Sequence, residues 1–165
     1  MRAALFETAR QPLIVKEVPD PACPRDGVVV AVEACGVCRS DWHAWNGADP
    51  DVTPPHVPGH EFAGVVVEVG SEVRHIKPGQ FVIGSFATSD NTCPHCQAGY
   101  QSSCVHREWM LRAQAPVLRV PLADGTLVRT PGVPSNDLIP SLLTTSDVLG
   151  TGWYAAVAAR VSRQA

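Results

Sequence analysis

The sequence predicts a mainly β fold with some α-helix, arranged as a partly open β-barrel. Its 165 residues are enough for one domain with a real core and too few for two full-sized ones. The chain contains 15 prolines and 13 glycines, which divide it into short segments. Short β-like runs recur between turn signals over about the first 90 residues. A partly open barrel of roughly five or six strands would protect the edges of such strands.

The strands are expected at 2–6, 12–18, 27–34, 61–69 and 80–86. Valines alternate along the third run, which is typical of a strand with at least one buried face. The Pro78-Gly79 pair before the fifth run favours a type II turn. Strand character returns in residues 117–131, on both sides of a turn at Asp124-Gly125.

Two segments depart from the strand pattern. Residues 87–106 are polar, carry cysteines and lack periodicity, so we expect a loop that needs a cross-link to be ordered. From Ser135 the leucines follow near-helical spacing, and alanines follow Gly152, which predicts helix to the end of the chain. The apolar face of this helical segment predicts a homo-oligomer, aggregation or a frayed tail.

Composition excludes several classes of function. The net charge is −3 and the sequence has no basic run, so no nucleic-acid surface is expected. The longest apolar runs are far shorter than a membrane span. Glu7 interrupts the first apolar run, so a secretory signal is not expected and the chain is assigned to the cytoplasm. In that compartment six cysteines indicate metal binding or catalysis rather than disulfides.

The loop at 87–106 has the spacing of a zinc site. Two cysteines separated by two residues can occupy adjacent corners of a zinc tetrahedron, and a third cysteine closes the loop. A carboxylate three residues before the first cysteine is a harder but acceptable fourth ligand. His95 and His106 are rivals for that position, and three free cysteines are the alternative to a metal site. The predicted ligands are Asp90, Cys93, Cys96 and Cys104.

A second group of metal-binding residue types lies at strand ends. Cys38 follows the run at 27–34, and His60 and Glu61 open the run at 61–69. A thiolate, an imidazole and a carboxylate at strand ends can converge on one ion. The alternative is that His60 is a hydrogen-bonded structural residue.

Two further motifs lack the surroundings that their functions need. Cys35-x2-Cys38 matches a dithiol redox motif, but no strand–motif–helix pattern surrounds it. The segment GTGWYA at 150–155 matches a dinucleotide fingerprint, but it lacks both a preceding strand and an acidic residue about twenty positions later. We interpret this match as accidental.

Taken together, several segments resemble the zinc-dependent alcohol dehydrogenases of the medium-chain dehydrogenase/reductase superfamily. They are GVCRSDWHAW, PGHEFAGVVVEVG, KPGQFVIG, the cysteine loop and TSDVLGTGWYAA. The resemblance implies a GroES-like partly open β-barrel with a zinc-loop lobe and a C-terminal helical stub. It divides the chain into a catalytic domain at 1–134, with the lobe at 87–106, and a helical segment at 135–165. In the family a Rossmann domain and a return segment follow, so we expect a chain truncated before the cofactor-binding domain.

The resemblance also implies roles for individual residues. The catalytic zinc ligands would be Cys38, His60 and Asp147, with Glu61 as an alternative ligand. Asp41 would hold the imidazole of His60, and Arg39 would contact the pyrophosphate of the cofactor. Ser40 and His43 would form a proton relay. Asp90 stands where the structural site of the family has its first cysteine.

The function implied is oxidation of an alcohol to an aldehyde or ketone, with hydride transfer to NAD or NADP and with zinc as the metal. The substrate would be a small alcohol or aldehyde, whose identity the sequence leaves open, as it does the choice between NAD and NADP. Without the cofactor domain the chain is expected to be inactive alone. A non-enzymatic zinc-binding β-barrel module is the alternative function.

Overall fold

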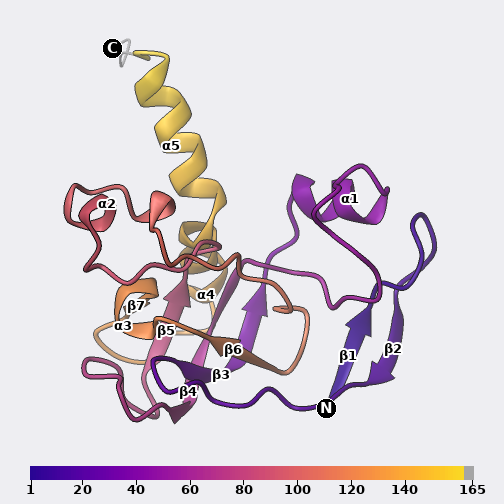
Figure 1. The fold of residues 1–165 in the computed structure, drawn as a ribbon, viewed down its shortest axis with the longest axis horizontal. Coiled ribbons are helices and arrows are strands. Elements are labelled where there is room, and N and C mark those ends of the chain that lie inside the picture. Colours follow the sequence, from indigo (N-terminus) through magenta and orange to yellow (C-terminus); the bar gives the residue numbers. More distant parts are fainter. Residues whose placement is uncertain (162–165) are drawn as a thin grey trace.

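A computed structural model describes residues 1–161, and an open five-stranded antiparallel sheet forms its centre (Figure 1). The strand order is β6-β3-β4-β5-β7, so β6 and β7 form the two edges and the sheet does not close on itself. The predicted class, mainly β with some helix and without a closed barrel, is confirmed. The strands are β3 (Val28–Cys35), β4 (Phe62–Val69), β5 (Phe81–Gly84), β6 (Val117–Val120) and β7 (Leu127–Arg129).

The pairing of the strands differs from the sequence-based expectation in two places. Strands β1 (Arg2–Leu5) and β2 (Ile14–Glu17) pair only with each other, as a separate two-stranded sheet. Between β6 and β7, the Asp124-Gly125 turn is one short helix, α3 (Ala123–Thr126). This helix carries the chain from one edge of the large sheet to the other, so the two strands are not a hairpin.

Different residues pack against the two faces of the large sheet. One face carries the main core, whose fully buried side chains include Phe62, Leu118 and several valines. On the other face Ala63, Phe81 and Ile83 are covered by the apolar side chains of α4 (Ile139–Leu143). This helix therefore fixes the C-terminal part of the chain against β4 and β5, and the segment that follows it ends beside the first residues of β4.

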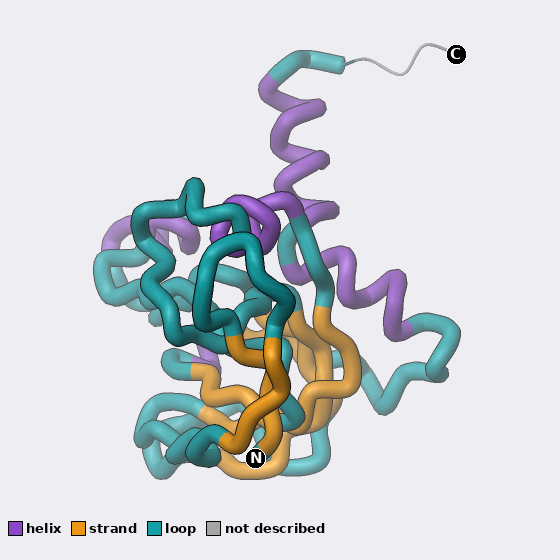
Figure 2. Tube along the Cα trace, turned by 90° about the vertical axis from the view of Figure 1, so that its right-hand side faces the viewer, coloured by secondary structure: helices purple, strands orange, loops and turns teal. Residues whose placement is uncertain are grey.

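The remaining helices lie outside the sheet. They are α1 (Arg39–Trp45), α2 (Pro94–Gln97), α5 (Val148–Ala158) and the 3₁₀ turns η1 (Gln101–Ser103) and η2 (Thr144–Ser146). Helix α5 projects away from the body of the molecule (Figure 2), and none of its side chains is buried. The helical prediction for the C-terminal segment is confirmed as far as α5, and residues 162–165 lie outside the described residues. None of the helices in 1–161 is long and apolar enough to cross a membrane.

Candidate metal centres

Cys38 lies at the N-terminus of α1, where a capping box fixes it. Its sulfur accepts a hydrogen bond from the backbone N–H of Ser40, and the Asp41 carboxylate accepts one from the backbone N–H of Cys38 at 2.9 Å. This reciprocal pattern satisfies two N–H groups that a helix start leaves unpaired. The cap therefore holds both the thiol and the carboxylate in place between β3 and β4.

His60 presents its two ring nitrogens to two different sets of groups. Nε2 lies 3.3 Å from Cys38 Sγ and 3.4 Å from Asp147 Oδ2. Nδ1 lies 3.6 Å from Asp41 Oδ1, a distance longer than a hydrogen bond but short enough for electrostatic attraction. An acidic neighbour on Nδ1 favours the tautomer whose Nε2 lone pair faces the other two residues, which is the arrangement of a metal-binding imidazole.

The hydroxyl groups of two nearby residues position Asp147 at this site. The buried Ser146 donates a hydrogen bond to the Gly84 carbonyl and accepts one from the Phe62 N–H at 3.2 Å, which ties the C-terminal segment to β4 and β5. Thr151 donates to Asp147 Oδ1 at 2.8 Å, leaving Oδ2 directed at His60. Residues more than 80 positions apart are thereby brought to one point.

Glu61 supplies the strongest indication that a cation fits this site. Its side chain is only 4% exposed, and its Oε1 has no hydrogen-bond partner among the described residues. Burial, and next the Asp147 carboxylate, raise the pKa of Glu61. Gly36 makes room for this carboxylate, because a Cβ there would lie 2.2 Å from Glu61 Oε2. A buried carboxylate oxygen without a donor is stabilised by a metal ion.

The ligand atoms of these residues form one compact group. Each of them offers one donor atom within 4.8 Å of all the others, and the group is Cys38, His60, Glu61 and Asp147. Sulfur, nitrogen and carboxylate oxygen together form a donor set suited to zinc. The structure thus brings together Cys38, His60 and Glu61, which were expected to converge from strand ends, and Asp147, which the family resemblance implied.

The other residues predicted for this site differ in their position relative to the cluster. Ser40 Oγ lies 3.1 Å from Cys38 Sγ and 3.5 Å from His60 Nε2, so its hydroxyl faces the cluster. His43 is exposed, and no hydrogen bond joins it to Ser40 in the described chain. Arg39 is also exposed, with its guanidinium 4.2 Å above the Trp42 ring.

The dithiol interpretation of Cys35 and Cys38 receives no support. Cys35 Sγ donates to the Gly36 carbonyl, whereas Cys38 Sγ contacts Ser40 and His60. Burial raises the pKa of the Cys35 thiol to about 12, which is opposite to the lowered pKa of a redox-active cysteine.

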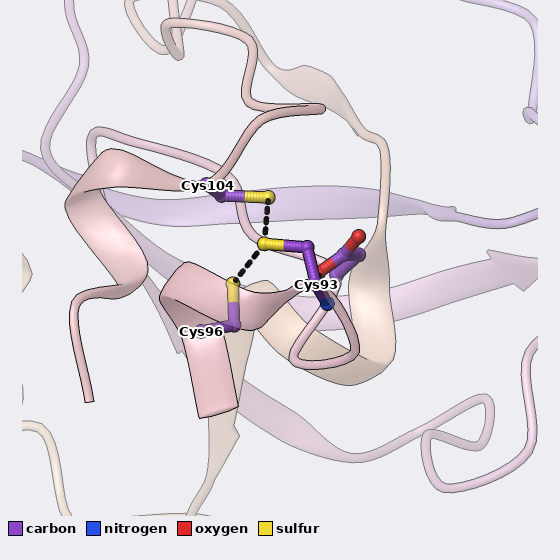
Figure 3. Close-up of side chains that lie close together, drawn as sticks. Cys93, Cys96 and Cys104 are labelled. Atoms are coloured by element: carbon purple, nitrogen blue, oxygen red, sulfur yellow. Dashed lines mark hydrogen bonds between the residues drawn. The ribbon is translucent and has the colours of Figure 1, made fainter. Parts of the chain in front are cut away.

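The second cluster lies in the lobe at 87–106. Cys93 Sγ lies 3.5 Å from Cys96 Sγ and 4.0 Å from Cys104 Sγ, with all three side chains buried (Figure 3). Hydrogen bonds from the backbone N–H groups of Cys96 and Val105 lower the pKa of Cys93, while burial raises the pKa of Cys96 to about 12. A thiolate at Cys96 therefore needs a neighbouring cation, and the three sulfurs fit a soft or borderline metal such as zinc.

Asp90 completes this second group. A carboxylate oxygen of Asp90 lies within 4.8 Å of all three sulfurs, which makes it the fourth residue of the cluster. The two rival histidines differ from it: His95 is exposed on α2, and His106 donates its ring N–H to Asp90 Oδ2 at 2.6 Å. This hydrogen bond, followed by those from the backbone N–H groups of Cys93 and Thr92, keeps the pKa of Asp90 well below its usual range.

Three residues near the clusters were missed from the sequence. Ser146 lies within the segment TSDVLGTGWYAA, but no local pattern shows that its hydroxyl group bonds to Phe62 and Gly84. Phe86 meets the His60 ring edge-on at 6.4 Å between centroids, and Trp109 stacks on Phe86 at 5.9 Å. These two aromatic residues come from the segments on either side of the lobe and form an apolar wall beside His60, a contact that no local pattern signals.

Replacing Ser146 with alanine is expected to weaken metal binding at the cluster around His60. The change leaves the Phe62 N–H and the Gly84 carbonyl without the hydroxyl group, at a cost of about 1–3 kcal/mol in folding free energy. Because Asp147 loses its anchor, we expect metal affinity to fall about 10–100-fold. Competition with a chromophoric chelator measures this affinity. Ser141→Ala, on the exposed part of α4, is the control, and equal affinities in the two variants would contradict the prediction.

Comparison with known proteins places this geometry in a family. Residues 24–142 match the alcohol dehydrogenase GroES-like domain. The chain belongs to this family. It is 35% identical, over 94% of its length, to the medium chain reductase/dehydrogenase ucsI of an Acremonium species, and 37% identical, also over 94%, to the zinc-type alcohol dehydrogenase B of Aspergillus flavus. The structure of an alcohol dehydrogenase from Thermus sp. ATN1 superimposes with a TM-score of 0.86 at 32% identity, over 96% of this GroES-like chain.

The GroES-like chain covers only part of these relatives. It spans 54% of the Acremonium protein, 37% of the Aspergillus protein and 47% of the Thermus chain. The Aspergillus relative is a zinc-type alcohol dehydrogenase and the Thermus neighbour is an alcohol dehydrogenase, and both are oxidoreductases. The family expected from the sequence motifs is therefore confirmed.

Proposed function

We propose that this chain is the zinc-binding catalytic domain of an alcohol dehydrogenase that oxidises an alcohol to an aldehyde or ketone with hydride transfer to NAD or NADP. The observation that carries the proposal is the convergence of the donor atoms of Cys38, His60, Glu61 and Asp147 within 4.8 Å of one another. When bound there, zinc supplies positive charge that favours ionisation of an alcohol, and the nicotinamide accepts the hydride. The second cluster, Asp90 with three cysteines, would hold a structural zinc.

Within this proposal the residues of α1 handle the proton of the alcohol. The Ser40 hydroxyl faces the cluster and is placed to accept a hydrogen bond from the substrate hydroxyl. His43 lies three residues further along the same helix, hence on the same face, and its exposed ring can pass the proton to solvent. Asp41 orients His60, and Arg39, exposed at the helix start, would contact the pyrophosphate of the cofactor. The aromatic wall of Phe86 and Trp109 favours alcohols with an apolar substituent.

The remaining parts of the proposal concern location and association. None of the six cysteines, all of which lie in residues 1–161, forms a disulfide, which fits the reducing cytoplasm. The exposed apolar side chains of α5, including Trp153 and Tyr154 at 72% exposure each, favour self-association of the isolated chain.

Two protein samples test the proposed activity. The 165-residue chain alone is expected to form no NAD(P)H from a panel of primary and secondary alcohols, since all strand pairs in residues 1–161 are antiparallel and form no βαβ unit for a dinucleotide. Fused to the remaining half of the Thermus alcohol dehydrogenase, the chain is expected to gain turnover.

In the fusion protein, Ser40→Ala is expected to lower kcat about 10²–10⁴-fold, because it removes the group that takes the proton. Ser40→Thr keeps a hydroxyl and is the matched control. A folded, zinc-loaded fusion protein without turnover would favour a non-enzymatic zinc-binding module, and turnover by the chain alone would contradict its predicted inactivity.

A further inference from the structure

Hydrogen bonds hold both carboxylate oxygens of Asp90 without a metal ion. Its Oδ1 accepts hydrogen bonds from the backbone N–H groups of Thr92 at 2.9 Å and Cys93 at 3.1 Å. These bonds close a turn that places Cys93 at the start of α2. Its Oδ2 accepts the hydrogen bond from His106 Nδ1 at 2.6 Å. The carboxylate is 12% exposed, so three donors and the cysteine cluster define its orientation.

His106 contacts the cluster twice. Its side chain holds Asp90, the first residue of the group, and its backbone N–H donates to the sulfur of Cys104, the last residue, at 3.4 Å. The imidazole itself is 66% exposed and is not among the four residues whose donor atoms converge. The residue therefore bridges the two ends of the lobe from outside the cluster.

We propose that His106 is a positioning residue for Asp90, so that the lobe binds its metal through three thiolates and a carboxylate whose orientation depends on the His106 hydrogen bond. A carboxylate on a short side chain can turn away from a metal, and a hydrogen bond from an outer partner removes that freedom. A cysteine at position 90 would not need such a partner, because a thiolate ligates through its single sulfur. The dependence on His106 is thus specific to the aspartate.

A second consequence concerns the choice of metal. Carboxylate oxygen is a harder ligand than thiolate, so a site with one oxygen and three sulfurs discriminates less strongly in favour of soft cadmium than a site with four sulfurs. Asp90→Cys is therefore expected to raise cadmium affinity more than zinc affinity.

The test compares His106 variants in two backgrounds. All proteins carry His60→Ala, so that the lobe is the only complete four-residue group remaining in the described chain. Zinc affinity is measured by chelator competition, and the ligand set is read from the thiolate-to-cobalt absorption of the Co²⁺ form. With Asp90 present, His106→Ala is expected to weaken zinc binding about 10–100-fold. His106→Asn, which keeps a donor, is expected to recover most of the affinity. With Asp90→Cys present, His106→Ala is expected to change nothing.

Three outcomes would overturn the proposal. Equal weakening by His106→Ala in both backgrounds would mean that His106 supports the fold of the lobe rather than Asp90. Loss of the cobalt spectrum in His106→Ala, with the spectrum kept in Asp90→Ala, would make His106 the ligand. No effect with Asp90 present would remove any role for His106. None of these measurements uses turnover. The His106 proposal can therefore fail while the proposed alcohol dehydrogenase function stands, and the alcohol dehydrogenase function can fail while the His106 proposal stands.

Discussion

Replacing His60 with alanine is expected to remove one metal ion per chain and to leave the ion of the lobe in place. The imidazole contacts two of the other ligands, because its Nε2 lies 3.3 Å from Cys38 Sγ and 3.4 Å from Asp147 Oδ2. Without it, two carboxylates and a thiolate are left close together with no neutral ligand between them. Their mutual repulsion opens the cluster, so we expect a loss larger than the about 10–100-fold that changes outside the ligand set produce.

Native mass spectrometry of the zinc-loaded chain measures this loss directly, since it counts the ions bound to each molecule. The matched control is His75→Ala, because His75 is exposed and engages its neighbours only through its backbone. The control protein should keep the same metal content as the unmodified chain. If the His60→Ala protein also retains its full metal content, the cluster around His60 is not a metal centre and the proposed function loses its foundation.

The two clusters differ in how much of them the sequence could reveal. Cys93, Cys96 and Cys104 lie close together in the chain, and their spacing alone indicates a metal lobe. Cys38 lies shortly after the run at 27–34 and His60 shortly before the run at 61–69, so their positions at strand ends could suggest that they converge. Asp147 has no such local signal and could be identified only through the resemblance to a family.

The hydrogen bonds that hold the ligands of these clusters in place could not be predicted, since each one joins segments that are distant in the sequence. Ser146 holds β4 and β5 through hydrogen bonds with Phe62 and Gly84, which lie more than 60 positions away. The roles of His95 and His106 stayed open in the sequence, because one-dimensional spacing does not say which imidazole faces which carboxylate. In the structure the His95 ring is exposed on α2, whereas the His106 ring donates a hydrogen bond to Asp90.

Strand positions were predictable and strand partners were not. Each expected run overlaps an observed strand, because alternation and turn residues are local properties. The order β6-β3-β4-β5-β7 and the separate β1–β2 sheet depend on non-local pairing, which many registers of the same pattern would allow. The short helix α3 illustrates this, since the Asp124-Gly125 pair suits a hairpin turn equally well.

Replacing Cys96 with serine is expected to unfold the lobe while the sheet stays folded. Within residues 91–104, all of which the structure describes, only the three cysteines are buried. This part of the lobe therefore has no apolar core that could replace metal binding, which in zinc-finger peptides supplies roughly 10–16 kcal/mol. The main core around Phe62 and Leu118 shares no residue with the lobe and should survive.

Hydrogen exchange can locate the boundary of this unfolding. The amides of Ala98 and Tyr100, bonded to Pro94 and His95, should lose their protection, because these bonds exist only while the lobe is folded. The amides of Thr88 and Met110 should keep theirs, since their bonds to Glu108 and Phe86 join the two ends of the lobe, outside residues 91–104, to each other. Cys23→Ser, outside the lobe, is the control and should leave both sets unchanged. Persistent protection of Ala98 and Tyr100 in the Cys96→Ser protein would mean that the lobe is ordered by its turns alone, and that metal is not what stabilises it.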